Sequence, residues 1–314
     1  MKNHISTYTK PMRTIARILL TGVLLTACLS VKAQLNPFQS MYFQNQYLYN
    51  PAMAGLDRVL NVNVGYRKQW NSFPGAPKTA SLTMDYQAAD RVGLGININD
   101  DQTGLIRQTR IMGTYAYHVP LSDNNQRLNF GLSLGVNDGR VNYNNINGDL
   151  SDEEINIYNQ LKPYVDGDFG AAYTSNHLNI GAAVPNLKSA FFKGSDDRYD
   201  ADRLLFITTV SYKMLIQGDG APFVLEPLAA LRVVKGYDDI VDAGFNFSMP
   251  NYAGLYLQGI YHSSNSMGLG FGLDQQVYAL SFSYNLETGQ LANYAQGAFE
   301  LGLKLRLFKK QEKN

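Results

Sequence analysis

The sequence predicts an all-β fold: a transmembrane up-and-down antiparallel β-barrel of about 14 strands, preceded by a short N-terminal helical or plug segment. Three observations predict it. Apolar and polar residues alternate within segments of about nine to eleven residues, and these segments recur from residue 60 to the end of the chain. After residue 33, no stretch approaches the roughly 18 uncharged apolar residues that a spanning helix needs. Glycine, tyrosine and phenylalanine occur 28, 21 and 15 times, which is typical of a barrel with a roomy interior and aromatic rims.

The alternation is clear in the first two predicted strands, 60–67 and 80–87, where every second residue is apolar. A water-soluble sheet can alternate in the same way, so the prediction depends on the recurrence and not on any one strand. Twelve further segments show the same pattern or a weaker form of it: 92–98, 107–119, 128–136, 165–173, 178–184, 204–214, 223–233, 240–247, 252–261, 267–273, 278–284 and 299–307.

The lengths of the connections give an independent indication of a membrane barrel. If the N-terminus is periplasmic, the periplasmic joins are all short, whereas the two longest connections, 138–163 and 185–203, fall on the outer side. A two-sheet sandwich has no reason to segregate long and short connections. Within the first long connection, a capping box beginning at Ser151 predicts a small helix that ends before Pro163.

Residues 1–33 read as a secretory signal peptide. Their charges are all basic, the apolar core from Ile18 to Leu29 is too short to span a membrane, and Val31-Lys32-Ala33 resembles a cleavage site. The single cysteine, Cys28, lies within this leader. It is either discarded with the leader or, because Leu25 to Cys28 resembles a lipobox, the site of lipidation.

The predicted organisation continues with a lead-in or plug segment at 34–58, the barrel at 59–308 and a periplasmic tail at 309–314. In the lead-in, Asn36 and Pro37 suit the start of a short helix, and Pro51 suits its end. An ordered coil that merely precedes the first strand is the alternative.

The sequence gives little indication of enzyme chemistry. His118, His177 and His262 lie on different predicted strands without metal-ligand spacing, and no G-x-S-x-G motif is present. His262-Ser263-Ser264 could belong to a barrel hydrolase, but a polar strand end is the simpler interpretation. We therefore predict no enzymatic activity, no cofactor and no metal. With 27 basic and 26 acidic residues, the formal charge also gives no indication of nucleic-acid binding.

Charged side chains are predicted to line the barrel interior and to form cross-strand pairs there. They fall at or near inward positions of the alternation: Asp85, Asp166, Asp168, Lys213, Glu226, Arg232, Lys304 and Arg306.

One block of motifs resembles a known family. The residues that carry the resemblance are Asn50, Pro51, Ala52 and Gly55 in Asn50-Pro51-Ala52-Met53-Ala54-Gly55, Tyr66, Arg67 and Gln69 in the first strand, and Phe73-Pro74-Gly75-Ala76-Pro77 after Trp70. This block is similar to the opening signature of the PorP/SprF family of type IX secretion and gliding motility in the Bacteroidetes. The later strands fit the family by architecture only.

The resemblance implies a non-enzymatic barrel of the bacterial outer membrane that helps to secrete particular cargo proteins or to retain them at the cell surface. It also implies three kinds of protein partner: the type IX machinery in the periplasm and outer membrane, secreted cargo with a C-terminal sorting domain, and a peptidoglycan-binding periplasmic protein. Membrane lipid would surround the barrel. A transporter or porin with an N-terminal plug is the alternative function.

The loop after the first strand is the candidate partner-contact site, comprising Trp70, Phe73, Pro74, Gly75 and Pro77. Exposed loops on a rigid scaffold are where binding usually resides. The competing interpretation is structural, with Trp70 anchoring the membrane interface and Pro74-Gly75 fixing a stiff turn.

Overall fold

The computed structural model describes residues 41–69, 75–141, 153–188, 204–217, 222–234, 238–288 and 297–308. The predicted signal peptide at 1–33 and the tail at 309–314 lie outside these residues. Within these residues, the regular structure consists of strands, with helix α2, two short 3₁₀ turns and the helical residues 187–188 in addition. Their bounds are β1 Leu60–Gln69, β2 Lys78–Ala89, β3 Val92–Thr103, β4 Ile106–Pro120, β5 Arg127–Val141, β6 Tyr164–Thr174, β7 Leu178–Val184, β8 Leu204–Tyr212, β9 Met214–Ile216, β10 Phe223–Val234, β11 Ile240–Met249, β12 Leu255–His262, β13 Ser266–Asp274, β14 Tyr278–Glu287 and β15 Ala298–Leu307.

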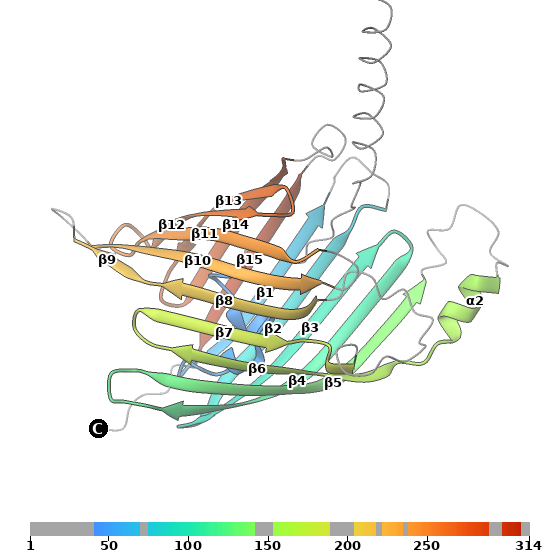
Figure 1. The fold of residues 1–314 in the computed structure, drawn as a ribbon, viewed down its shortest axis with the longest axis horizontal. Coiled ribbons are helices and arrows are strands. Elements are labelled where there is room, and N and C mark those ends of the chain that lie inside the picture. The colour runs from blue at the N-terminus through green and yellow to red at the C-terminus, as the bar shows by residue number, and fades with distance from the viewer. Residues whose placement is uncertain are drawn as a thin grey trace, which may run out of the picture. The chain divides into compact units, whose positions relative to one another are not determined.

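The strands pair antiparallel with their neighbours in sequence and close into a barrel (Figure 1). The closing pair is β1 with β15, in a register that runs from Leu60 opposite Leu307 to Gln69 opposite Ala298. β8 and β9 both pair with β10 and together form one barrel strand, interrupted at Lys213. The result is the closed 14-strand antiparallel barrel that the sequence predicts.

The two faces of the wall differ in chemistry as the alternation predicts. Apolar side chains such as Leu134 and Val165 point outward and are 66% and 62% exposed. Polar side chains such as Thr83 and Asn129 point inward and are fully buried. Because every second strand residue is apolar and exposed, the outer face suits hydrocarbon, while the inner face forms its own polar network.

The connections differ between the two ends of the barrel. At one end, which we call the short-turn end, β2–β3, β4–β5, β6–β7, β11–β12 and β13–β14 join through 90–91, 121–126, 175–177, 250–254 and 275–277. At the other, the long-loop end, β5–β6 and β7–β8 join through 142–163 and 185–203. This segregation is the one that the sequence predicts.

The helix predicted after Ser151 is present as α2, Glu153–Gln160, in the β5–β6 connection. It is tied to the adjacent barrel strand, because the Asn159 side chain accepts from Val141 N at 2.7 Å and donates to Val141 O at 3.1 Å. α2 therefore packs on its own barrel. Among the described residues, no helix has the length and apolar character needed to cross a membrane.

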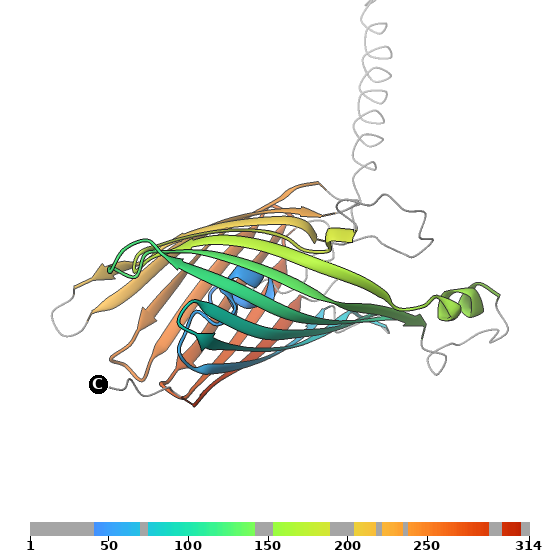
Figure 2. The ribbon, with the colours of Figure 1, turned by 90° about the horizontal axis from the view of Figure 1, so that it is seen from below.

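Residues 41–55, here called the lumen segment, lie inside the ring of strands (Figure 2). The sequence predicts a short helix or plug segment here, and the described part lies in the lumen as a plug. It contains a hydrogen-bonded turn at 41–44 and the 3₁₀ turns η1, Gln46–Leu48, and η2, Pro51–Met53. Its backbone makes two bonds of the helical i to i−4 type, Asn45 N to Met41 O at 3.0 Å and Asn50 N to Gln46 O at 3.1 Å. It also bonds to the barrel wall, because Leu48 O accepts from Asn97 Nδ2 at 3.2 Å and Ala54 O lies 3.1 Å from His118 Nε2.

Candidate functional site: the occupied lumen

The sharp turn at Asn50-Pro51-Ala52 holds the lumen segment against β6 and β7. Proline disfavours a helical conformation for the residue before it, and Asn50 is extended, with φ −136° and ψ 109°. Its Oδ1 accepts from Ala52 N at 3.0 Å, and its Nδ2 donates to Ala171 O and Ala182 O at 3.4 and 3.5 Å. Asn50 thus caps the turn and also bonds to two neighbouring strands.

Glycines occupy the positions of the barrel wall that lie closest to this turn. A Cβ added to Gly131 would collide with the backbone of Pro51 and Ala52, and one added to Gly93 would collide with the carbonyl of Ala54. A Cβ on Gly170 would collide with Asn50 Oδ1. The segment approaches β3, β5 and β6 so closely that only a residue without a side chain fits at these positions.

The end of the lumen segment is fixed to the short-turn end of β2 and β4. His118 Nε2 lies 3.1 Å from Ala54 O, and its Nδ1 lies 2.9 Å from Asn129 Oδ1. Gly55 N donates to Asp85 Oδ2 at 3.0 Å. Gly55 has φ +67°, a conformation that glycine adopts without steric cost, and the chain turns there toward β1.

The start of the lumen segment reaches the opposite wall. Tyr42 Oη donates to Asp242 Oδ2 at 2.5 Å, and the same carboxylate accepts two bonds from Arg232, at 2.6 and 2.8 Å, and lies 2.6 Å from His262 Nδ1. All four side chains are buried. Burial is also the main reason that the pKa of the Tyr42 phenol is raised, so Tyr42 stays protonated and donates.

Two further ion pairs, one buried and one partly buried, link inward-facing residues of the wall. Arg67 of β1 lies 3.2 Å from Glu300 of β15, and Arg110 of β4 lies 2.5 Å from Asp168 of β6. With the pair of Arg232 and Asp242, these cross-strand pairs include two of the predicted charged residues, Asp168 and Arg232, whose partners were not predicted. Lys213 differs, because it is exposed where β8 gives way to β9.

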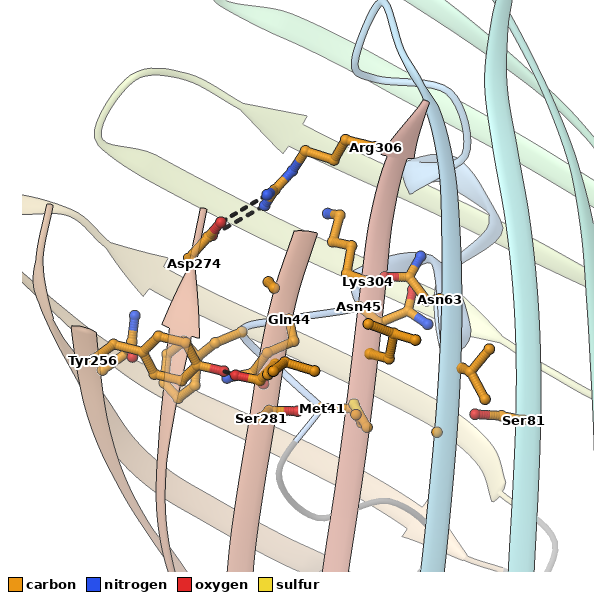
Figure 3. Close-up of a pocket in the computed structure, with 18 of the residues that line it drawn as sticks. Met41, Gln44, Asn45, Asn63, Ser81, Tyr256, Asp274, Ser281, Lys304 and Arg306 are labelled. Carbon is orange, nitrogen blue, oxygen red and sulfur yellow. Dashed lines mark hydrogen bonds and ion pairs between the residues drawn. The ribbon is translucent and has the colours of Figure 1, made fainter. Parts of the chain in front are cut away.

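A cavity of about 130 Å³ remains between residues 41–45 and the wall formed by β11–β15, β1 and β2. Figure 3 shows Gln44 and Tyr256 on one side of it, Asn45 and Asn63 on the other, and Lys304 between them. Arg306 and Asp274 are joined at its edge by two bonds, of 2.7 and 3.0 Å. The lining is therefore mainly polar and includes a charged rim.

The predicted site residues fall in two separate places. Asn50, Pro51, Ala52 and Gly55 lie together in the lumen, where Ala52 is fully buried. Tyr66, Arg67 and Gln69 lie toward the opposite end of β1. Tyr66 points outward and packs near Phe299, with ring centroids 6.1 Å apart.

The candidate partner-contact loop is described only in part, because Trp70, Phe73 and Pro74 lie outside the described residues. Gly75 is exposed at φ +77°, and its carbonyl accepts from Gly104 N at 2.9 Å. Pro77 is buried, and its carbonyl accepts from Gln69 N at 2.9 Å. The described end of the loop is thus held by backbone bonds to the barrel rim.

The described residues offer no group of three or more His, Cys, Asp or Glu side chains that could hold a metal ion. His262 lies beside Asp242, but that carboxylate also binds Arg232 and Tyr42. Ser263 Oγ accepts from Val241 N at 2.9 Å, which is a strand-end contact. The geometry around His262-Ser263-Ser264 is therefore that of a structural polar cluster at a strand end, which was the simpler of the two interpretations of this motif.

A closed antiparallel barrel with an apolar outer face, a polar inner face and a lumen occupied by its own chain defines a transmembrane β-barrel of the bacterial outer membrane. The family model for the type IX secretion system membrane protein PorP/SprF matches residues 31–305. The chain belongs to this family, as the resemblance implies.

Solved structures similar to this chain are outer-membrane proteins at low sequence identity. Omp33 of Acinetobacter baumannii has a TM-score of 0.43 and 9% identity, with 81% of this chain and 100% of that chain covered. The KdgM porin has a TM-score of 0.39 and 8% identity over 79% and 99%. CdiB from Acinetobacter baumannii has a TM-score of 0.41 and 8% identity over 80% and 60%. No curated protein matches the chain.

Proposed function

We propose that this protein is a non-enzymatic, protein-binding barrel of the type IX secretion system that supports secretion or surface retention of specific cargo proteins, gliding adhesins among them. One observation carries the proposal. The lumen segment crosses the barrel from β3, where Asn97 binds Leu48 O at 3.2 Å, to β11, where Asp242 accepts from Tyr42 at 2.5 Å. A lumen filled by the protein's own chain favours binding of other proteins at the barrel ends over passage of solutes.

The partners follow from membership of a secretion family. The family associates with the secretion machinery. In our proposal the finer partners are components of that machinery in the periplasm and outer membrane, cargo with a C-terminal sorting domain, and a peptidoglycan-binding periplasmic protein. Membrane lipid contacts the apolar outer face, and no nucleic acid is involved.

The proposed contact site for cargo is the loop from Trp70 to Pro77 at the long-loop end. Its described end provides a firm base, since Gly75 O and Pro77 O accept backbone bonds from Gly104 and Gln69 at 2.9 Å. A loop held in this way loses less conformational entropy when a partner binds. This support is independent of the family signature.

The test replaces residues 70–74 with Gly and Ser and leaves Gly75, Ala76 and Pro77 in place to keep the anchoring bonds. We expect the barrel to reach the outer membrane in normal amounts, while surface levels of one or more sorting-domain proteins fall several-fold by surface proteomics. The matched control replaces Ser122-Asp123-Asn124, in a turn at the short-turn end, with Gly-Ser-Gly and should leave cargo unchanged. Normal surface levels of all such proteins in the loop variant would refute the proposed role of the loop.

Conductance in planar bilayers separates this function from that of a transporter or porin with an N-terminal plug. We expect no large steady current from the purified barrel. A large open channel in the unmodified protein would instead support the transporter function.

A further inference from the structure

The cavity beside Lys304 lies at the end of the barrel opposite the loop proposed to contact cargo. Its lining includes Asp274, the last residue of β13, and Arg306, the penultimate residue of β15, both at the short-turn end. Their side chains are 49% and 21% exposed, so solvent reaches the edge of the cavity. Residues 41–45 of the lumen segment form its inner side. The cavity is thus a recess at the short-turn end and not a channel through the barrel.

Several polar groups around this recess have unused bonding capacity. Gln44 Oε1 and Asn246 Oδ1 are buried and accept no hydrogen bond within the part of the chain that the structure describes. Buried polar atoms without a partner are uncommon in native proteins and call for an explanation. Gln44 uses its other amide atom, Nε2, to donate to Gln258 at 2.6 Å, and this bond fixes the position of its side chain.

Lys304 supplies a positive charge. Among the described residues no carboxylate lies within 4.0 Å of its ammonium group, whereas its neighbour Arg306 is neutralised by Asp274 at 2.7 Å. Asp57 and Asp85 act on Lys304 only from a greater distance, and neither lines the cavity. Asp85 is already bonded to Gly55 N and Asn61 Nδ2, at 3.0 and 3.2 Å.

We propose that this recess binds an acidic residue of an extended polypeptide that enters from the short-turn end. The ammonium group of Lys304 would pair with the carboxylate. The amide of Asn246, held by a bond of 3.4 Å to Ser248 Oγ, would turn its Oδ1 toward the recess and accept a peptide N–H group of the same chain. A cavity of about 130 Å³ accepts one side chain, since each water in the liquid occupies about 30 Å³. The inference goes beyond the proposed function because it concerns the other end of the barrel and does not depend on the cargo.

The test measures binding of two short peptides to the full barrel in detergent micelles by isothermal titration calorimetry. The probes are acetyl-Ala-Glu-Ala-amide and its glutamine counterpart, acetyl-Ala-Gln-Ala-amide. We expect the glutamate peptide to bind at least tenfold more tightly. Lys304→Gln should abolish the difference, and Lys304→Arg should retain most of it. Heat-modifiable migration on gels verifies that each variant is folded.

Arg107→Gln is the matched control, because Arg107 pairs with Asp100 at the long-loop end and is 58% exposed. It should bind both peptides as the unmodified barrel does. Equal binding of the two peptides, absence of any binding, or unchanged selectivity in Lys304→Gln would overturn the proposal. Binding of galacturonate, measured in the same way, tests whether the recess binds a small organic anion and not a polypeptide. If it bound as tightly as the glutamate peptide, the polypeptide assignment would be wrong.

Discussion

The lumen segment meets two walls of different character. On the side of β3, β5 and β6, it packs on Gly93, Gly131 and Gly170, where an added Cβ would strike its backbone or the Asn50 side chain. On the side of β11–β15, it leaves a cavity of about 130 Å³ lined by polar side chains such as Asn246 and Lys304. Close backbone packing thus fixes the segment on the side of β3, β5 and β6, while a polar-lined cavity remains on the side of β11–β15.

The largest effect is expected at the glycine wall. In Gly131→Ala, the new methyl group would collide with the backbone of Pro51 and Ala52, which cannot move without disturbing the buried turn. Overpacking of this kind costs about 1–3 kcal/mol, and we expect the upper end of that range in urea unfolding from lipid vesicles.

The control is Gly113→Ala, on β4. Its new Cβ would meet Leu134 O at 3.8 Å, an ordinary contact, so the free energy of unfolding should change by about 0.5 kcal/mol or less. Equal effects of the two substitutions would show that close packing of the turn does not hold the segment in place.

An intermediate effect is expected where the segment touches the opposite wall. Tyr42→Phe removes the hydrogen bond to Asp242, while Arg232 still neutralises that carboxylate and His262 Nδ1 still lies 2.6 Å from it. A hydrogen bond to a charged group contributes about 1.5–3 kcal/mol, and we expect a loss near the lower limit in the same unfolding assay. Tyr261→Phe, at an outward position that is 53% exposed, should leave stability unchanged. If the Tyr42→Phe barrel were as stable as the Tyr261→Phe barrel, Tyr42 would not anchor the lumen segment.

The smallest effect is expected in the wall of the cavity. An Asn→Ala substitution can be made there and also in the wall on the opposite, closely packed side. Asn246→Ala should alter the free energy of unfolding by about 0.5 kcal/mol or less, because Asn246 Oδ1 has no partner and Nδ2 makes only a long bond of 3.4 Å to Ser248 Oγ. Asn129→Ala should cost about 1–3 kcal/mol, because Asn129 donates to Ala172 O and Thr174 Oγ1 and lies 2.9 Å from His118. If Asn246→Ala lowered the free energy of unfolding as much as Asn129→Ala, the wall beside the cavity would be as closely packed as the wall of β3, β5 and β6.

Alternation predicted most of the barrel because side chains of a strand point to opposite faces with a period of two. Strands such as β5 and β13 combine outward leucines with inward Gly, Ser or Asn, and this pattern appears without any tertiary information. The short α2 helix was also predictable, because capping and the following proline are local signals. The segment before Pro51, predicted as a short helix or plug, forms single turns such as Asn45 N to Met41 O and lies in the lumen as a plug.

The lumen site was predictable only in part. The Asn50 to Gly55 block could be recognised as a turn. The glycines that pack against it lie on other strands, and nothing in their local sequence indicates this contact. Tyr42 and Asp242 are separated by 200 positions, and no periodicity relates them. The cavity around Lys304 could not be predicted from the sequence, because it is the space left between the lumen segment and the strands that line it.

By itself the sequence determined that this is a closed, lipid-facing sheet with a polar interior, because alternation and turn spacing are local properties of the chain. Its opening signature also indicated the secretion family. Only the tertiary structure decided that the signature lies within the lumen, which strands hold it and where a recess remains. These features depend on side chains that come together when the barrel closes, and closure sets the distance of each strand from the segment inside.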